Sequence, residues 1–279
     1  MCLILFAWQT HPRYRLVVAA NRDESFERPS APAGLWSDCP QVLAGRDLEA
    51  GGTWLGITRA GRFAAISNYR APAEKQSGAP SRGALVGDFL RGADAPLAYL
   101  KRIAPQAAAF NGFNLLAGDR DSLYFLSNRG AGVERVAPGV HGLSNHLLDT
   151  PWPKVERGKA ALATLLERPF EGEDLLEMLA DTTIMADGAL PATGASLDWE
   201  RRLSAMRIVA GTYGTRCSTA LSVAADGDIR FAERSYAPDG STTETVRFHL
   251  PPAGGAISPD GATSPDGESR PRQIRPLAR

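Results

Sequence analysis

The chain opens with Met1-Cys2-Leu3-Ile4-Leu5-Phe6-Ala7-Trp8 and returns, after a polar break, with Tyr14-Arg15-Leu16-Val17-Val18-Ala19-Ala20-Asn21-Arg22-Asp23-Glu24. Each of the two apolar runs is about as long as a strand, and turn residues separate them. We therefore expect a hairpin with strands at 3–8 and 14–20. Because the strands of a hairpin are antiparallel, the end of the second lies beside the start of the first. This arrangement brings Asp23 close to the amino terminus.

The cysteine at position 2 is a candidate nucleophile. An initiator methionine ahead of a small residue such as cysteine is commonly removed, which would leave Cys2 with a free α-amine beside its thiol. Ordinary pKa values of about 8.5 for the thiol and about 7.7–8.0 for the amine allow proton exchange near neutral pH. One residue would then supply both nucleophile and base. Alternatively, Cys2 is a small apolar residue that starts a buried strand.

Length and charge limit the classes of partner. The 279 residues suffice for one large domain or two small ones with a substantial core. Lys plus Arg and Asp plus Glu number 31 each, so no net charge favours nucleic acid or an anionic membrane. No stretch approaches the ~18–20 apolar residues of a membrane-spanning helix. We expect a protein without nucleic-acid partners or membrane spans, and its oligomeric state is open.

The cysteines indicate the compartment. Three of them, Cys2, Cys39 and Cys217, are scattered along the chain without a CxxC pair or metal-ligand spacing. An odd, scattered set suits a reducing compartment better than a disulfide framework. The short opening apolar run, with no basic segment before it, does not resemble a signal peptide. The sequence therefore predicts a cytoplasmic protein with no metal site.

Beyond residue 24, short apolar runs and helical spacings predict further elements. The expected strands are 51–57, 62–68, 113–117, 123–127, 133–136, 214–225, 228–236 and 243–250, and the expected helices are 82–91, 96–103, 154–166 and 174–180. The several prolines of residues 25–50 predict an irregular segment with a turn at Gly45-Arg46-Asp47. Hairpins mixed with paired helices favour an α+β fold, in which antiparallel sheet packs on helices.

Composition also predicts the domain organisation. Residues 1–250 are expected to form a single domain. Residues 251–279 are rich in Pro, Gly, Ser and charge, with few large apolar side chains, so we expect a flexible tail. No GxGxxG after a strand and no GxxxxGK[ST] is present, so nucleotide-binding motifs are absent from the sequence.

Four polar positions are candidates for chemistry beside Cys2. Asp23 could orient the α-ammonium, and Arg22 could lower the pKa of the thiol; alternatively, residues 21–24 form a salt-bridged strand end. Asn68 and Asn145 could donate to an oxyanion, or be ordinary turn residues. Arg216 could hold an anionic substrate or stabilise a thiolate, or be a surface cation.

The histidines give two weaker alternatives. A Cys-His-Asn hydrolase would use His146 with Asn145, although sequence neighbours rarely serve as consecutive members of a triad. His141 or His146 could ligate heme, but no CxxCH motif is present.

Seven ordered motifs resemble the NRDE family, also called the transport and Golgi organisation family, over residues 1–250. They are Met1-Cys2, Asn21-Arg22-Asp23-Glu24, Gly52-Thr53-Trp54-Leu55-Gly56, Ser67-Asn68-Tyr69-Arg70, Gly142-Leu143-Ser144-Asn145, Pro151-Trp152-Pro153-Lys154 and Gly214-Thr215-Arg216-Cys217-Ser218-Thr219. The family is similar to N-terminal nucleophile hydrolases of the choloylglycine hydrolase and penicillin acylase type. The resemblance implies a four-layer αββα sandwich.

The resemblance also implies roles for particular residues. Cys2 would be the nucleophile and its α-amine the base, with Asp23 orienting that amine. Asn68 and Asn145 match oxyanion-hole or substrate-positioning carboxamides, and Arg216 matches an active-site arginine. Substrate contacts are expected from Asn21, Arg22 and Trp54. The relatives carry an arginine three residues before the aspartate, whereas here Arg22 directly precedes Asp23.

Three functions follow from this resemblance. The first is hydrolysis or acyl transfer at linear amide or acyl bonds of a small-molecule substrate, without a cofactor. The second is non-catalytic binding or trafficking of heme or an acyl-lipid such as acyl-CoA, because the family is associated with Golgi organisation, lipid metabolism and heme trafficking. The third is a structural domain without chemistry. Fold alone does not choose among them.

Overall fold

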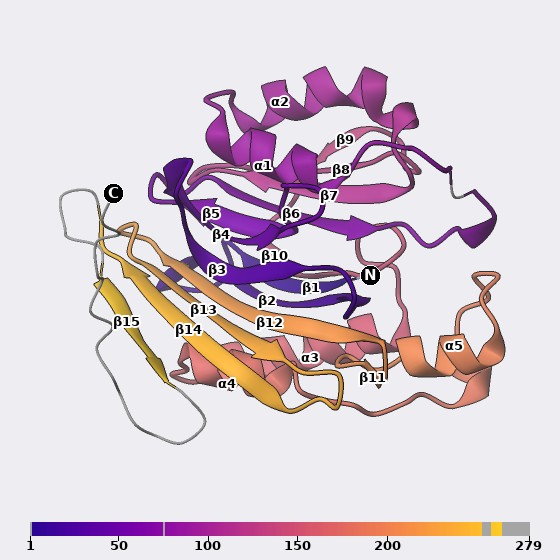
Figure 1. Cartoon of the computed structure of the whole chain (residues 1–279). Coiled ribbons are helices and arrows are strands. Elements are labelled where there is room, and N and C mark those ends of the chain that lie inside the picture. Colours follow the sequence, from indigo (N-terminus) through magenta and orange to yellow (C-terminus); the bar gives the residue numbers. More distant parts are fainter. Residues whose placement is uncertain (1, 75, 253–257, 264–279) are drawn as a thin grey trace, which may run out of the picture.

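The computed structural model describes residues 2–74, 76–252 and 258–263 of the chain (Figure 1). Two antiparallel sheets lie face to face, and helices cover the outer face of each sheet (Figure 1). The expected four-layer αββα sandwich is thereby confirmed.

The first sheet contains both ends of the described chain. Its strand order is β10 (Gly139–Leu143), β1 (Cys2–Trp8), β2 (Tyr14–Ser25), β12 (Tyr213–Ala224), β13 (Ile229–Tyr236), β14 (Thr242–Leu250) and β15 (Ser258–Thr263), with β11 (Val209–Ala210) paired to β12. The second sheet runs in sequence order through β3 (Ser30–Trp36), β4 (Cys39–Asp47), β5 (Leu55–Thr58), β6 (Phe63–Asn68), β7 (Phe113–Gly118), β8 (Leu123–Ser127) and β9 (Val133–Arg135).

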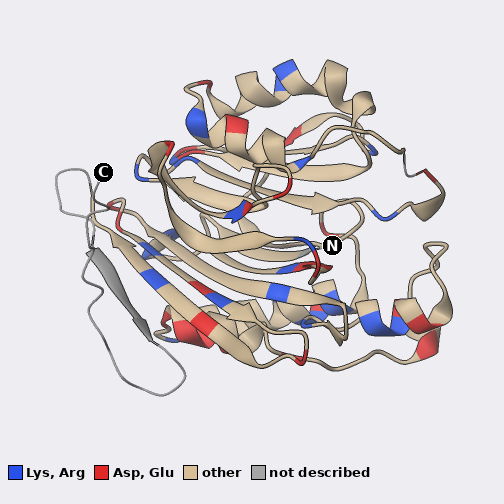
Figure 2. Cartoon of the chain, in the orientation of Figure 1, with Lys and Arg blue, Asp and Glu red and all other residues tan. Residues whose placement is uncertain are grey.

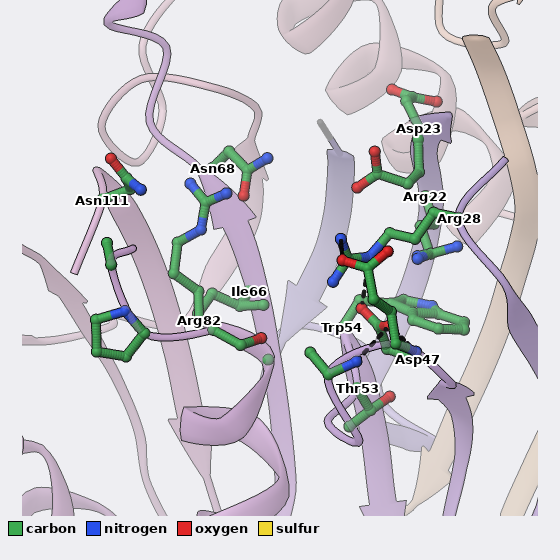
Figure 3. Close-up of a pocket in the computed structure, with 17 residues that line it drawn as sticks. Arg22, Asp23, Arg28, Asp47, Thr53, Trp54, Ile66, Asn68, Arg82 and Asn111 are labelled. Carbon is green, nitrogen blue, oxygen red and sulfur yellow. Dashed lines mark hydrogen bonds and ion pairs between the residues drawn. The ribbon is translucent and has the colours of Figure 1, made fainter. Parts of the chain in front are cut away.

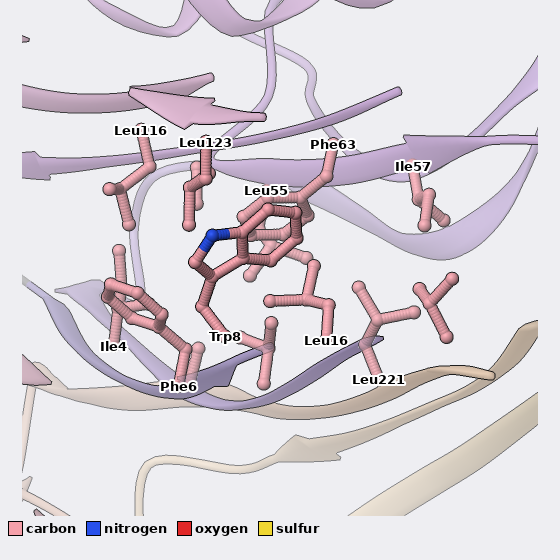
Figure 4. Packing of buried hydrophobic residues seen from close by; sticks show 14 of the residues in the cluster. Ile4, Phe6, Trp8, Leu16, Leu55, Ile57, Phe63, Leu116, Leu123 and Leu221 are labelled. Atoms are coloured by element: carbon pink, nitrogen blue, oxygen red, sulfur yellow. The ribbon is translucent and has the colours of Figure 1, made fainter. Parts of the chain in front are cut away.

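The side chains of β1 explain why this strand lies inside the sandwich. Successive side chains of a strand point to opposite faces, and both faces of β1 are apolar. Ile4, Phe6 and Trp8 point into the space between the sheets and pack against residues of the second sheet (Figure 4). The alternate residues, Leu3, Leu5 and Ala7, pack against the helices of the outer layer.

Two helical layers complete the sandwich. Helices α3 (Pro153–Leu166) and α4 (Gly172–Met178) cover the first sheet, while α1 (Gly83–Arg91) and α2 (Pro96–Ile103) cover the second. The chain also forms α5 (Leu197–Leu203), which the sequence did not predict, and the 3-10 helices η1 (Pro72–Glu74), η2 (Ala104–Ala109) and η3 (Asp187–Ala189). Among the described residues, no helix has the length and apolar character needed to cross a bilayer. Both signs of charge occur together on α5 and along β13 and β14 (Figure 2).

The prediction of an irregular segment at 25–50 was wrong. Strands β3 and β4 fill most of it, and the expected turn at Gly45-Arg46-Asp47 lies within β4. Pro32 is tolerated because β3 is an edge strand, where a missing N–H need not break the ladder. The pairing of β3 with β4 also shifts register between Ala31 and Gly34, next to Pro32.

The second strand is longer than the sequence predicted. β2 continues to Ser25, so Asn21-Arg22-Asp23-Glu24 lies inside the strand and does not follow it. Pairing with β12, from a distant part of the chain, extends β2 in this way. At the other end of the chain, β15 lies within the segment expected to be a tail, and residues 253–257 and 264–279 lie outside the described part.

Candidate functional site

A cleft of about 380 Å³ opens at the end of the sandwich where β2, β6 and the start of α1 meet. In Figure 3, Arg22, Arg28 and Trp54 lie on one side of the cleft and Asn68, Arg82 and Asn111 on the other. Its wall also includes Asp23, Glu24, Asp47, Glu49, Ala50, Thr53, Ile66, Ala79, Pro80, Ser81 and Gly83. Most of these side chains are polar, so the cleft suits a polar ligand.

Backbone pairing brings the start of β1 to this cleft. In the β1–β2 ladder, Cys2 is the partner of Arg22, and Leu3 is the partner of Asn21. The hairpin that the sequence predicted is therefore confirmed. It places the backbone of Cys2 opposite a residue of the cleft wall.

Arg22 and Trp54 form one wall of the cleft. The guanidinium carbon of Arg22 lies 4.2 Å from the centre of the Trp54 ring, in cation–π geometry. Space for this ring depends on Gly45, because a Cβ atom there would lie 2.3 Å from Trp54 Cζ2. Two of the three residues that the sequence expected to contact substrate, Arg22 and Trp54, are thus adjacent and line the cleft.

Asp23 reaches the cleft from β2 and is almost wholly buried. Its Oδ1 accepts a hydrogen bond from Thr215 Oγ1 at 2.7 Å. Burial raises the pKa of Asp23 above its usual value, while the charges of nearby groups, Lys154 first among them, act in the opposite direction. Such a carboxyl can hold a proton or pair with a cation at the cleft.

Asn68 and Asn145 lie together, but only Asn68 lines the cleft. Asn145 is fully buried behind it and donates from Nδ2 to the backbone carbonyl of Asn68 at 2.9 Å. Asn145 Oδ1 faces the Arg70 guanidinium at 3.4 Å, and Arg70 forms a buried ion pair with Glu200 of α5 at 2.6 Å. These contacts fix the orientation of the Asn145 carboxamide.

Arg216 occupies a β-bulge in β12. Thr215 pairs with Asp23 and Cys217 pairs with Arg22, so Arg216 is the extra residue between them. Its guanidinium donates from Nη1 to the carbonyls of Ser25 and Arg28, both at 2.8 Å. It does not line the cleft, but it lines a neighbouring cavity of about 220 Å³ that shares the Trp54 wall.

Asn21 is held inside the first sheet and does not line the cleft. Its Nδ2 donates to the carbonyls of Leu179 and Met206, and its Oδ1 accepts from Ser218 Oγ at 2.6 Å. These bonds link β2 to β12 and to the segment after α4. A role for Asn21 in substrate binding stays a prediction.

The two histidines considered as triad members or heme ligands, His141 and His146, each bond to a side chain nearby in the sequence. His141 Nδ1 bonds to Asp149 Oδ2 at 2.7 Å, and this contact raises the pKa of His141. His146 Nδ1 bonds to Thr150 Oγ1 at 2.9 Å, and burial lowers its pKa. Within the part of the chain that the structure describes, no group of three or more His, Cys, Asp or Glu residues could hold a metal ion.

Several residues of this site were not predicted as such. Arg70, Lys154 and Thr215 surround Asp23 and the asparagines, and each belongs to a motif quoted above without a role. The available signal was the charge of Arg70 and of Lys154, since each is the one charged residue of its motif. Glu200 gave no signal, because its partner lies 130 positions away.

The sequence profile described as Transport and Golgi organisation 2 matches residues 1–238, most of the chain. The chain belongs to the Transport and Golgi organisation 2 family. The expected membership is thereby confirmed. The motifs that resemble this family contribute part of the cleft wall, namely Arg22, Asp23, Glu24, Thr53, Trp54 and Asn68.

Relatives in this family match almost end to end. The Transport and Golgi organization protein 2 homolog of Bos taurus is 38% identical over 277 residues, covering 90% of this chain and 99% of the relative. The Drosophila melanogaster Transport and Golgi organization protein 2 is 27% identical over 276 residues, covering 88% and 96%.

The solved structures that align with this chain are more distant in sequence. A Caenorhabditis elegans N-acylethanolamine-hydrolyzing acid amidase ortholog aligns with TM-score 0.45 and 10% identity, covering 79% of this chain and 92% of that one. A mutant conjugated bile acid hydrolase of Clostridium perfringens aligns with TM-score 0.43 and 9% identity, covering 99% and 97%. Likenesses at this level carry no inference about ligands.

Proposed function

We propose that the chain is a cytoplasmic N-terminal cysteine amidohydrolase or acyltransferase that acts on linear amide or acyl bonds of a small molecule. The observation that carries the proposal is the pairing of the Cys2 backbone with Arg22, at a cleft lined by Arg22, Asp23 and Asn68. The backbone of the candidate nucleophile Cys2 thus lies beside the cleft whose wall contains the buried carboxyl of Asp23 and the carboxamide of Asn68. The three scattered cysteines support a reducing compartment.

The proposed reaction has two steps. After removal of Met1, the α-amine of Cys2 takes the thiol proton, and the thiolate attacks the carbonyl carbon of the substrate. As the tetrahedral intermediate collapses, the C–N bond breaks and the α-ammonium protonates the leaving amine, leaving a thioester on Cys2. Water, or an acceptor amine, then attacks the thioester, gives its proton to the α-amine and releases the acyl product with the thiol restored.

The surrounding residues have complementary roles in this proposal. Asp23, held by Thr215, would orient the α-ammonium. Asn68 on the cleft wall would donate to the developing oxyanion, and Asn145, buried behind it, would position Asn68 through its hydrogen bond to the Asn68 carbonyl. Arg70, through Asn145 Oδ1, keeps the amide nitrogen turned toward Asn68.

The alternative is a carrier of heme or an acyl-lipid that uses the same cleft without turnover. The largely polar wall favours the enzyme, because heme and long acyl chains need extended apolar contact. Titration with hemin followed by visible spectroscopy tests this alternative. A saturable Soret shift, lost in a Trp54→Ala variant, would support carriage.

Activity screening on a panel of N-acyl amino acids tests the enzymatic proposal. The wild-type chain should release free amino acid, and Cys2→Ala should lower the rate by about a thousandfold or more. Cys39→Ala is the matched control, since Cys39 is a half-buried free thiol outside the cleft and its loss should leave the rate unchanged. Equal rates for wild type and Cys2→Ala would refute the proposal.

A further inference from the structure

Two arginines of different strands meet at a single serine hydroxyl beside Trp54. Arg22 Nη1 donates to Ser30 Oγ at 3.4 Å, and Arg216 Nη2 donates to the same oxygen at 3.3 Å. Because both bond to one atom, the two guanidinium groups are close enough for a single oxyanion to bridge them. Burial lowers the pKa of Arg216, and repulsion from the Arg22 charge lowers it further.

Neither arginine forms an ion pair with a carboxylate among the described residues. Arg22 is only 6% exposed, so its charge has lost most of its water. Among the described side chains, its guanidinium contacts the Trp54 ring and makes one long hydrogen bond, to Ser30. Glu24 and Glu233 act on these charges from a distance, without forming ion pairs with them. A buried cation without a bonded counter-ion is costly.

The same chain contains a second arginine pair, and this pair shares a carboxylate. Arg46 and Arg91 lie over the Trp36 ring, 4.1 and 4.5 Å from its centre. Asp38 bonds to both guanidinium groups, at 3.0 Å to Arg46 and 2.9 Å to Arg91. At Trp54, a serine hydroxyl therefore occupies the place that a carboxylate occupies at Trp36.

We propose that Arg22, Arg216 and Ser30 form an oxyanion subsite that binds a carboxylate or phosphate group of the ligand. Arg22 lines the cleft, and Arg216 and Ser30 line the neighbouring 220 Å³ cavity. Trp54 belongs to the wall of both, so a ligand lying along the indole reaches both arginines. Guanidinium groups match the planar, bidentate geometry of such anions.

This inference deepens the proposed function by naming a substrate class: acyl or amide compounds that carry a carboxylate or phosphate near the bond to be cut. Only that identification of the ligand as a substrate rests on the proposed function. Anion binding itself requires no catalysis, so the two can fail separately.

Thermal unfolding and calorimetry with inorganic phosphate and with acetate test the subsite, with sodium chloride at matched ionic strength as the reference. The wild-type chain should bind phosphate, acetate or both saturably. Arg22→Gln and Arg216→Gln should each weaken anion binding and raise the dissociation constant about tenfold or more. Arg46→Gln, the matched arginine stacked on Trp36, should leave it unchanged. Binding of phosphate but not acetate would indicate that the ligand carries a phosphate group. Binding of acetate would indicate that the subsite also accepts a carboxylate group.

Ser30→Asp is the sharpest variant, because it places in this chain the carboxylate that Asp38 supplies at Trp36. It should raise the melting temperature without ligand and abolish stabilisation by phosphate or acetate. Ser30→Ala, which adds no charge, should keep anion binding. Unchanged binding in Ser30→Asp, or no saturable binding by the wild type, would overturn the subsite. So would binding that emerges only in Cys2→Ala, since the thiolate would then be the counter-ion.

Discussion

Thr215 donates a hydrogen bond to Asp23 across the β2–β12 ladder, although 192 positions separate the two residues in the sequence. The bond holds a buried carboxyl at the cleft that contains the proposed active site. Burial is the first cause of the raised pKa of Asp23. The charge state of this one carboxyl therefore depends on its environment in the folded protein.

The first prediction is a pH dependence of stability that Asp23→Asn removes. A raised pKa means that the folded state binds the proton more tightly than the unfolded state. The stability from Asp23 is fully present below its unfolded pKa of about 3.9 and is lost as pH rises through the folded pKa. The melting temperature of Asp23→Asn relative to wild type should therefore increase from pH 4 to pH 8. Thermal unfolding at several pH values measures this difference.

Thr215→Val is the companion variant for that measurement. It removes the hydroxyl that favours the charged carboxylate, so its stability should fall more steeply with pH than that of wild type. A difference between Asp23→Asn and wild type that is flat or decreases with pH would contradict the raised pKa.

The second prediction concerns the buried ion pair of Arg70 with Glu200. Their side chains are 4% and 5% exposed, and their bond is 2.6 Å long. Glu200→Gln should cost about 3–5 kcal/mol of unfolding free energy, because it leaves the guanidinium buried without its counter-ion. It should also lower catalytic activity, since Arg70 contacts Asn145 Oδ1. Denaturant unfolding and the hydrolysis assay measure the two effects.

Asp94→Asn is the exposed control for this ion pair, because Asp94 bonds to Arg102 with both side chains about half exposed. Exposed pairs contribute little to stability. A loss in Glu200→Gln no larger than in Asp94→Asn would show that the buried pair does not hold α5 against the site.

The third prediction tests the close approach of Gly45 to Trp54. Gly45→Ala would place Cβ 2.3 Å from two atoms of the indole ring, so the ring must move. We expect a loss of about 1–3 kcal/mol in unfolding free energy and weaker anion binding. Gly34→Ala, on the neighbouring strand, is the control, since a Cβ there meets nothing within 4 Å. Equal stability of the two variants would show that the backbone of β4 at Gly45 does not fix the position of the Trp54 ring.

The sequence predicted the layers of the fold better than the details of the site. The continuous apolar run from Leu3 to Trp8 and the hairpin with β2 are local patterns, and the backbone of Cys2 accordingly lies opposite Arg22. The edge strand β3 was missed because Pro32 argues against a strand in the sequence. An edge strand nevertheless tolerates a proline, since one of its sides has no ladder to complete. Local pattern also failed at Glu200, since only the folded chain brings α5 to Arg70.

The charges of the site show the same limit. Arg22 and Arg216 were both candidates from their motifs, but their shared contact with Ser30 depends on the bulge in β12 and on the missed strand β3. A single residue inserted into a ladder leaves no periodic signal in the sequence. Such features follow from the tertiary pairing alone.

Acylation of Cys2 is the most direct test of the central claim. The wild-type chain is incubated briefly with p-nitrophenyl acetate, quenched in acid and analysed by intact mass and peptide mapping. We predict that Met1 is absent and that one acetyl group is carried by Cys2, with Cys39 unmodified. An intact Met1, or acetyl groups on Cys39 and none on Cys2, would contradict the proposed nucleophile.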